Sequence, residues 1–79
     1  MNPRALAVKY NDGYKLLVTF TNKEVKEFDL SPYLDYPVYE PLKDEAFSKK
    51  ARVINGIIQW NNDIDIAPDT LYLESKLIK

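Results

Sequence analysis

The stretch that decides the fold of this chain is Gly56-Ile57-Ile58-Gln59-Trp60-Asn61-Asn62-Asp63-Ile64-Asp65-Ile66-Ala67-Pro68-Asp69-Thr70-Leu71-Tyr72. It contains the only tryptophan, and its aspartates alternate with isoleucines as in a half-buried strand. Trp60 follows Ile58 on the same strand face, so we expect the indole in the core rather than stacked on a nucleobase. The stretch therefore predicts two strands followed by a helix.

Local signals set the boundaries of these elements. Asn55-Gly56 is the pair preferred in a type I′ turn, so residues 52–54 and 57–60 should form a hairpin. Pro68 suits the first position of a helix, and Asp69 then stands in its first turn. We expect this C-terminal helix to carry Leu73 and Leu77, four residues apart, on one side.

The N-terminal part reads as an antiparallel meander of three strands. The first strand alternates apolar and polar residues, with Leu6, Val8 and Tyr10 on its inner face. Asn-Asp-Gly at 11–13 forms a turn, and the second strand follows over residues 16–20. The third strand spans residues 24–28. Because Val25 and Phe28 cannot share a face of a regular strand, a bulge or an early end is expected there.

A proline-interrupted crossover follows over residues 30–41, too apolar for a solvated linker. Ser31 is expected to cap one short turn that opens with Pro32. Asp44 should cap a short helix that runs to about Lys50, with Phe47 as its inward anchor. The predicted class is therefore α+β: a meander, a second hairpin, a short middle helix and a C-terminal helix packed on the sheet, in one domain over residues 1–79.

Composition excludes several classes of protein. The 79 residues include no cysteine and no histidine, which removes disulfides, thiolate metal sites and the commonest general base. The net charge of −1 shows no basic excess for nucleic acid, and no segment is long enough to span a membrane. We expect a cytoplasmic protein, in which a second copy or a partner would add buried surface if the core is thin.

Four segments together resemble the bacterial family known as domain of unknown function 2442: residues 28–31 (FDLS), 37–44 (PVYEPLKD) with Phe47, 56–60 (GIIQW) and 65–72 (DIAPDTLY). The resemblance covers almost the whole chain. It implies a compact α+β domain built on antiparallel strands. Family members are commonly encoded beside another small uncharacterised protein, which implies a toxin–antitoxin-like pair. No catalytic residues are established for the family, so none is transferred.

Two groups of side chains are candidate sites. The tyrosines Tyr33, Tyr36 and Tyr39 cluster in the crossover, and tyrosine is enriched at protein interfaces. Alternatively, the acidic segment with Asp63, Asp65 and Asp69 would hold Mg²⁺ or Ca²⁺, or would serve a small enzyme or ligand-binding protein. The plainer interpretation gives these aspartates to the solvent face and the helix start.

Other carboxylates offer a pair for acid–base chemistry, but they have simpler roles. Asp29 stands beside the Ser31-Pro32 turn and Asp44 at a helix start, while Glu40 lies between them. An unpaired strand edge gives a second route to a partner, unless Lys26 and Glu27 discourage pairing there. We expect a non-catalytic interaction module without cofactor, an antitoxin-like partner of a small cognate protein.

Overall fold

The computed structural model describes residues 2–61 and 64–78. The described residues form two antiparallel sheets, which confirms the α+β class. The first sheet has the strand order β1-β2-β3-β7, with β1 at Ala5–Asn11, β2 at Lys15–Phe20, β3 at Val25–Asp29 and β7 at Lys76–Leu77. The second has the order β4-β5-β6, with β4 at Arg52–Ile54, β5 at Ile57–Asn61 and β6 at Ile64–Ile66.

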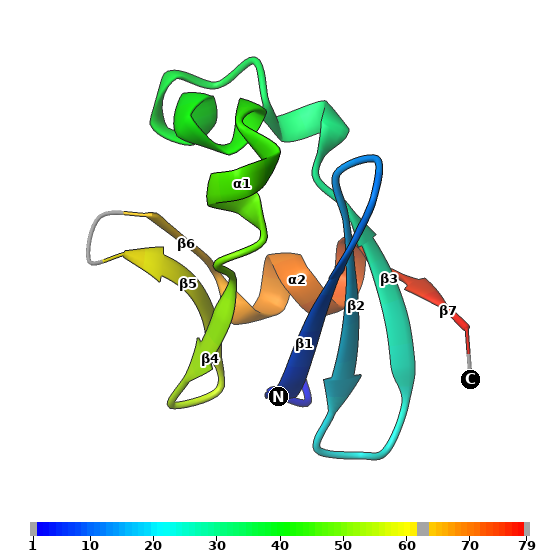
Figure 1. The fold of residues 1–79 in the computed structure, drawn as a ribbon. Coiled ribbons are helices and arrows are strands. Elements are labelled where there is room, and N and C mark those ends of the chain that lie inside the picture. Colours follow the sequence, from blue (N-terminus) through cyan, green and yellow to red (C-terminus); the bar gives the residue numbers. More distant parts are fainter. Residues whose placement is uncertain (1, 62–63, 79) are drawn as a thin grey trace.

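Short helices connect and cover these sheets. The crossover forms two 3₁₀-helices, η1 at Ser31–Tyr33 and η2 at Pro37–Lys43, and is followed by helix α1 at Glu45–Ser48. Helix α2, at Pro68–Glu74, carries the chain from the second sheet back to the first. Figure 1 shows the crossover and α1 at one end of the molecule, above both sheets. No helix among the described residues is long and apolar enough to cross a membrane.

The core lies between the sheets, the crossover and α2. Phe20, Phe28, Leu42 and Leu71 are almost completely buried. Trp60 is only 4% exposed, as its position after Ile58 predicted. Aromatic and aliphatic side chains from every part of the described chain therefore meet in one cluster.

The meander forms as expected, but its irregularity lies in the first strand and not in the third. Ala5 pairs with Phe20 while Ala7 pairs with Thr19, so a bulge places Leu6 between them, 64% exposed. The prediction that Leu6 faces the core is therefore wrong. Strand β3 pairs with β2 in regular register, and its inner face carries Phe28 and Lys26 in place of a second apolar residue.

The second hairpin is confirmed. Asn55 and Gly56 have φ values of 53° and 81°, the left-handed geometry that a type I′ turn requires at both central residues. Gly56 also lies against Arg4: a Cβ placed on it would stand 2.9 Å from the Arg4 Cβ and Cδ atoms. The turn therefore needs glycine for its backbone angle and for the space beside it.

The C-terminal segment differs from the prediction. Pro68 opens α2 as expected, but the helix ends at Glu74, so Leu77 belongs to strand β7. Leu73 is 65% exposed, because it lies about 200° around the helix from the buried Leu71. The two leucines therefore do not form the inward side of a helix. After Glu74 the chain leaves the helix and pairs with β3 as strand β7.

Polar side chains set the ends of the crossover helices. The Asp44 carboxylate accepts a hydrogen bond from the Ala46 N–H at 3.0 Å, which confirms it as the cap of α1. The helix ends at Ser48, earlier than Lys50. Ser31 is not the cap of η1, because its own N–H donates to the Asp29 carboxylate at 2.9 Å. Asp29 thus closes this turn.

Candidate functional site

The three predicted tyrosines of the crossover come together in the folded chain. The Tyr33 ring stacks on Phe28 with ring centres 5.3 Å apart. Tyr36 and Tyr39 each lie with their ring centres 6.1 Å from that of Tyr33. Because Phe28 is part of the core, the ring of Tyr33 links the other two tyrosines to the core.

These rings form part of an exposed apolar surface. Tyr36 and Val38 are each 55% exposed, whereas Tyr33 and Tyr39 are half-buried. We call these four residues the crossover surface. The Tyr39 hydroxyl donates a hydrogen bond at 3.0 Å to the Asp65 backbone carbonyl, which ties η2 to strand β6. The crossover surface is thus an exposed apolar surface with polar hydroxyl groups, and strand β6 supports it through the Tyr39 hydrogen bond.

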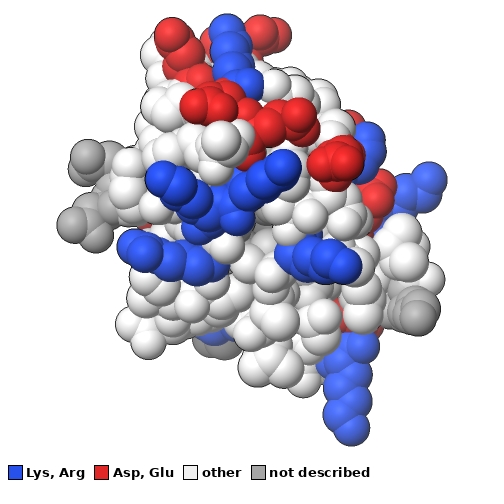
Figure 2. Space-filling model, viewed as in Figure 1, with Lys and Arg blue, Asp and Glu red and all other residues white. Residues whose placement is uncertain are grey.

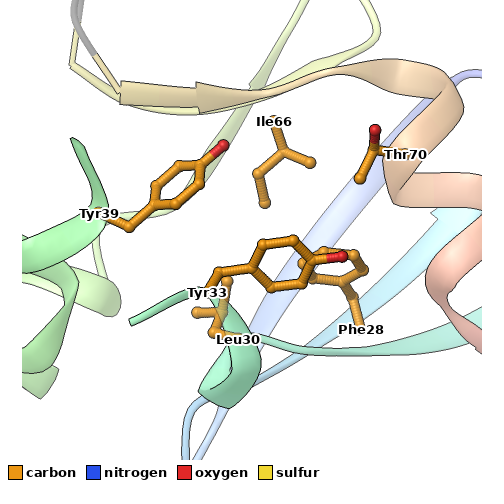
Figure 3. Close-up of a pocket in the computed structure, with 6 residues that line it drawn as sticks. All are labelled: Phe28, Leu30, Tyr33, Tyr39, Ile66 and Thr70. Carbon is orange, nitrogen blue, oxygen red and sulfur yellow. The ribbon is translucent and has the colours of Figure 1, made fainter. Parts of the chain in front are cut away.

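Beneath the crossover surface lies a small cavity. Figure 3 shows the six residues that line it, with the Tyr33 and Tyr39 rings facing Ile66 and Thr70: Phe28, Leu30, Tyr33, Tyr39, Ile66 and Thr70. Its volume is about 10 Å³, which leaves room for one water molecule at most. Pockets for small molecules are larger, at roughly 300 Å³ or more. The cavity therefore does not serve as a ligand site in this conformation.

A wider, open groove of about 510 Å³ adjoins this surface along the chain, lined by Pro37, Glu40, Pro41, Lys43 and Asp44. Among the described residues, the Glu40 carboxylate forms no hydrogen bond or ion pair. The Asp44 carboxylate is exposed and uses one oxygen to cap α1. The groove thus combines two proline rings and the Lys43 side chain with two carboxylates that can accept further donors.

Two hydroxyl groups of the crossover surface, those of Tyr33 and Tyr39, hold their protons more tightly than a free phenol. Burial raises the pKa of Tyr33, and it raises the pKa of Tyr39 in the same way. These two phenols can therefore donate hydrogen bonds from their hydroxyl groups while their rings present apolar faces.

The structure describes only two of the three aspartates in the alternative acidic site. Asp63 lies outside the described residues. Asp65 and Asp69 are exposed, and the Asp69 carboxylate accepts a hydrogen bond from the Asn2 amide at 3.1 Å. Within residues 2–61 and 64–78, no group of three acidic side chains is placed to hold a metal ion. Asp69 lies in the first turn of α2, and its hydrogen bond joins this turn to the N-terminal segment.

Two buttressing hydrogen bonds join tyrosines to glutamates far away in the sequence. The Tyr10 hydroxyl donates to Glu45 at 2.6 Å, and the Tyr72 hydroxyl donates to Glu24. Burial and the bond to Glu45 raise the pKa of Tyr10 to about 12. The bond from Tyr10 lowers the pKa of Glu45. Sequence reasoning missed both bonds, since no local pattern marks partners 35 and 48 residues apart.

One predicted open edge, that of strand β3, is covered by the chain itself. Strand β7 pairs with the outer edge of β3, and the Ile78 N–H donates to the Val25 carbonyl at 2.8 Å. Lys26 does not repel a neighbouring strand, because its ammonium donates to the Tyr72 carbonyl at 2.9 Å and lies 3.6 Å from the centre of that ring. A partner strand therefore cannot add directly to this edge of β3, and β7 is the outermost described strand on that side of the sheet.

The comparisons with known proteins agree with the resemblance seen in the sequence. The family model described as "Protein of unknown function (DUF2442)" matches residues 5–76. This range begins with strand β1 and reaches strand β7, so it takes in both sheets and the crossover. Neither a curated protein nor a solved structure matches the chain significantly.

Proposed function

This chain belongs to the DUF2442 family of proteins of unknown function, and for it we propose a non-catalytic role in which it binds a small cognate protein as an antitoxin binds its partner. The contact is made through the crossover surface. The observation that carries this proposal is the exposure of Tyr36 and Val38, 55% each, beside rings that are anchored in the core. Apolar side chains displayed together in this way mark protein contact sites.

The support beneath the surface favours tight association. Tyr33 is held by Phe28, and Tyr39 is held by its bond to strand β6. Side chains that are already ordered lose little conformational entropy when a partner arrives, so more of the contact energy remains as affinity. Aromatic rings also bury a large area with few rotatable bonds.

Four carboxylates of the chain have structural tasks. Asp29 and Asp44 accept backbone N–H groups, and Glu24 and Glu45 accept tyrosine hydroxyls. These hydrogen bonds lower the pKa of Glu24, Asp29 and Glu45, and a carboxylate with a lowered pKa is a poor general base near neutral pH. These assignments favour a binding role over a catalytic one.

The mechanism in this proposal is steric. When the partner binds the crossover surface, Tyr36 and Val38 would cover part of the partner's own surface. A substrate of the partner could then no longer reach that part. Inhibition would then need no chemical step and would end when the complex dissociates. The strength of binding would depend mainly on the apolar area buried at the centre of the contact.

The proposal is tested by co-purification of the full chain with the protein encoded beside it. We expect a complex that survives gel filtration at micromolar concentration. If the two proteins elute separately at that concentration, the proposed function is wrong. The neighbouring protein's own activity, measured with and without this chain, then reports whether the complex blocks it.

A further inference from the structure

We propose that the partner presents a basic segment to this chain, with an arginine side chain lying in the groove over Pro37 and Pro41, between Glu40 and Asp44. This inference rests on the proposed function and adds the chemistry of the partner to it. It uses the apolar crossover surface, the groove beside it and the charges around both.

The groove and the crossover surface belong to one continuous stretch of chain. Pro37 stands between Tyr36 and Val38, the two most exposed members of the crossover surface, and it also lines the groove. A stable interface covers roughly 800 Å² on each partner, far more than a few side chains. A partner that covers Tyr36 must therefore extend over the groove as well.

The charges of this region are mainly negative. Residues 35–45 include the acids Asp35, Glu40, Asp44 and Glu45 but only one cation, Lys43. Figure 2 shows acidic side chains gathered at the end of the molecule where Figure 1 places the crossover, with basic atoms among them and further basic side chains in a band below. Complementarity at this end calls for a positively charged partner surface.

Glu40 is the carboxylate of the groove that is most available to a positively charged partner. Its carboxylate forms no hydrogen bond or ion pair within residues 2–61 and 64–78, although Lys43 stands three positions along the same helix. Asp44 has a second carboxylate oxygen beyond the one that caps α1. Both groups are exposed and can accept donors without giving up a structural bond.

Arginine fits this groove better than lysine. Its guanidinium group is flat and weakly hydrated, so one face can lie on the proline rings while its N–H groups donate to carboxylates at the edges. A lysine ammonium is compact and strongly hydrated, and it would contact one carboxylate at a time. A groove lined by two prolines and two carboxylates, with Lys43 as its one cationic lining residue among the described residues, thus favours a planar cation that can use both kinds of contact.

The experiment titrates the ¹⁵N-labelled full chain with a short peptide of arginine, leucine and serine, and with its twin in which neutral citrulline replaces each arginine. We expect the arginine peptide to shift the amide signals of residues 37–44 and the citrulline peptide to bind at least about fivefold more weakly. Equal binding of the two peptides, or no binding of the arginine peptide, overturns the inference.

Matched variants separate the groove from general electrostatics. Glu40→Gln should weaken the arginine peptide about three- to fivefold, whereas Glu27→Gln, which removes the same charge from strand β3, should leave it within about twofold. Asp44→Asn lowers the charge further but keeps a side-chain oxygen for the cap of α1, so the helix is preserved. An equal loss with Glu27→Gln would show that the groove is not the site.

The proposed function and this inference can fail separately. If the neighbouring protein binds, and Tyr36→Ala weakens it while Glu40→Gln does not, the function stands and the arginine site is wrong. If the neighbouring protein does not bind at all, the function is wrong whatever the peptides do. Loss of the protein complex with Glu40→Gln, together with discrimination between the peptides, supports both.

Discussion

The indole N–H of Trp60 donates a hydrogen bond to the backbone carbonyl of Ser48 at 2.9 Å, with both residues buried. Ser48 in turn donates from its hydroxyl to the Leu42 carbonyl at 2.6 Å. The two bonds join strand β5 to the end of α1 and to η2. The second sheet thereby holds the helices that display the crossover surface.

Replacing Trp60 tests this link. Trp60→Phe leaves the buried Ser48 carbonyl without its donor and removes part of the core volume, so we expect the free energy of unfolding to fall by about 2 to 4 kcal/mol. Urea denaturation measures the loss. Tyr39→Phe is the control, because it removes a hydroxyl bond at an exposed site and should cost less than about 1 kcal/mol. If Trp60→Phe and Tyr39→Phe lowered the free energy of unfolding equally, Trp60 would not have the structural role given to it here.

The two glycines of the chain make a matched pair for the second hairpin. Both have positive φ, 85° at Gly13 and 81° at Gly56, but a Cβ at Gly13 meets nothing within 4 Å while one at Gly56 meets Arg4. We expect Gly13→Ala to cost about 1 to 2 kcal/mol for the backbone alone, and Gly56→Ala to cost more. Thermal unfolding of both variants gives the comparison. A Gly56→Ala protein as stable as Gly13→Ala would show that Arg4 moves aside freely.

The raised pKa of Tyr10 makes a prediction for alkaline solution. Its ordinary value is 10.0 and its value in the folded chain is about 12. The folded state thus holds this proton more tightly, so the stabilisation is complete below about pH 10 and is lost as the pH rises toward 12. Urea midpoints measured across this range should fall with pH.

Tyr10→Phe isolates that contribution. The variant should be less stable at neutral pH, because the Tyr14 N–H loses its acceptor and Glu45 keeps only the Gly13 N–H of its two donors. It should also lose less stability than the wild type between about pH 10 and 12. Tyr36→Phe is the control, since Tyr36 lies on the exposed surface. An unchanged alkaline slope in Tyr10→Phe would contradict the prediction.

The crossover surface is tested by a pair of truncations. Tyr36→Ala should weaken binding to the neighbouring protein by about 2 kcal/mol or more, since central aromatic side chains carry much of the energy of an interface. Leu6→Ala removes a residue that is 64% exposed near the start of strand β1 and is not part of the crossover, so it should leave binding unchanged. Isothermal calorimetry measures both affinities. If Tyr36→Ala and Leu6→Ala changed the affinity equally, Tyr36 would not be at the centre of the contact.

Much of the fold follows from short sequence signals. Asn55-Gly56 predicts the type I′ turn, Asp44 the cap of α1 and Pro68 the start of α2, and all three are confirmed. These signals succeed because each depends on the conformational preferences and hydrogen bonds of a few adjacent residues. The grouping of Tyr33, Tyr36 and Tyr39 follows in the same way from their spacing within one short crossover.

Other features appear only when distant segments meet. A bulge turns Leu6 outward, Leu73 faces solvent, and β7 pairs with β3. The positions of neighbouring strands decide these outcomes, and local preference does not. The same holds for Tyr10 with Glu45 and for the groove around Glu40. Local chemistry thus determined the elements of this protein, while long-range packing decided which faces were buried and which remained free for a partner.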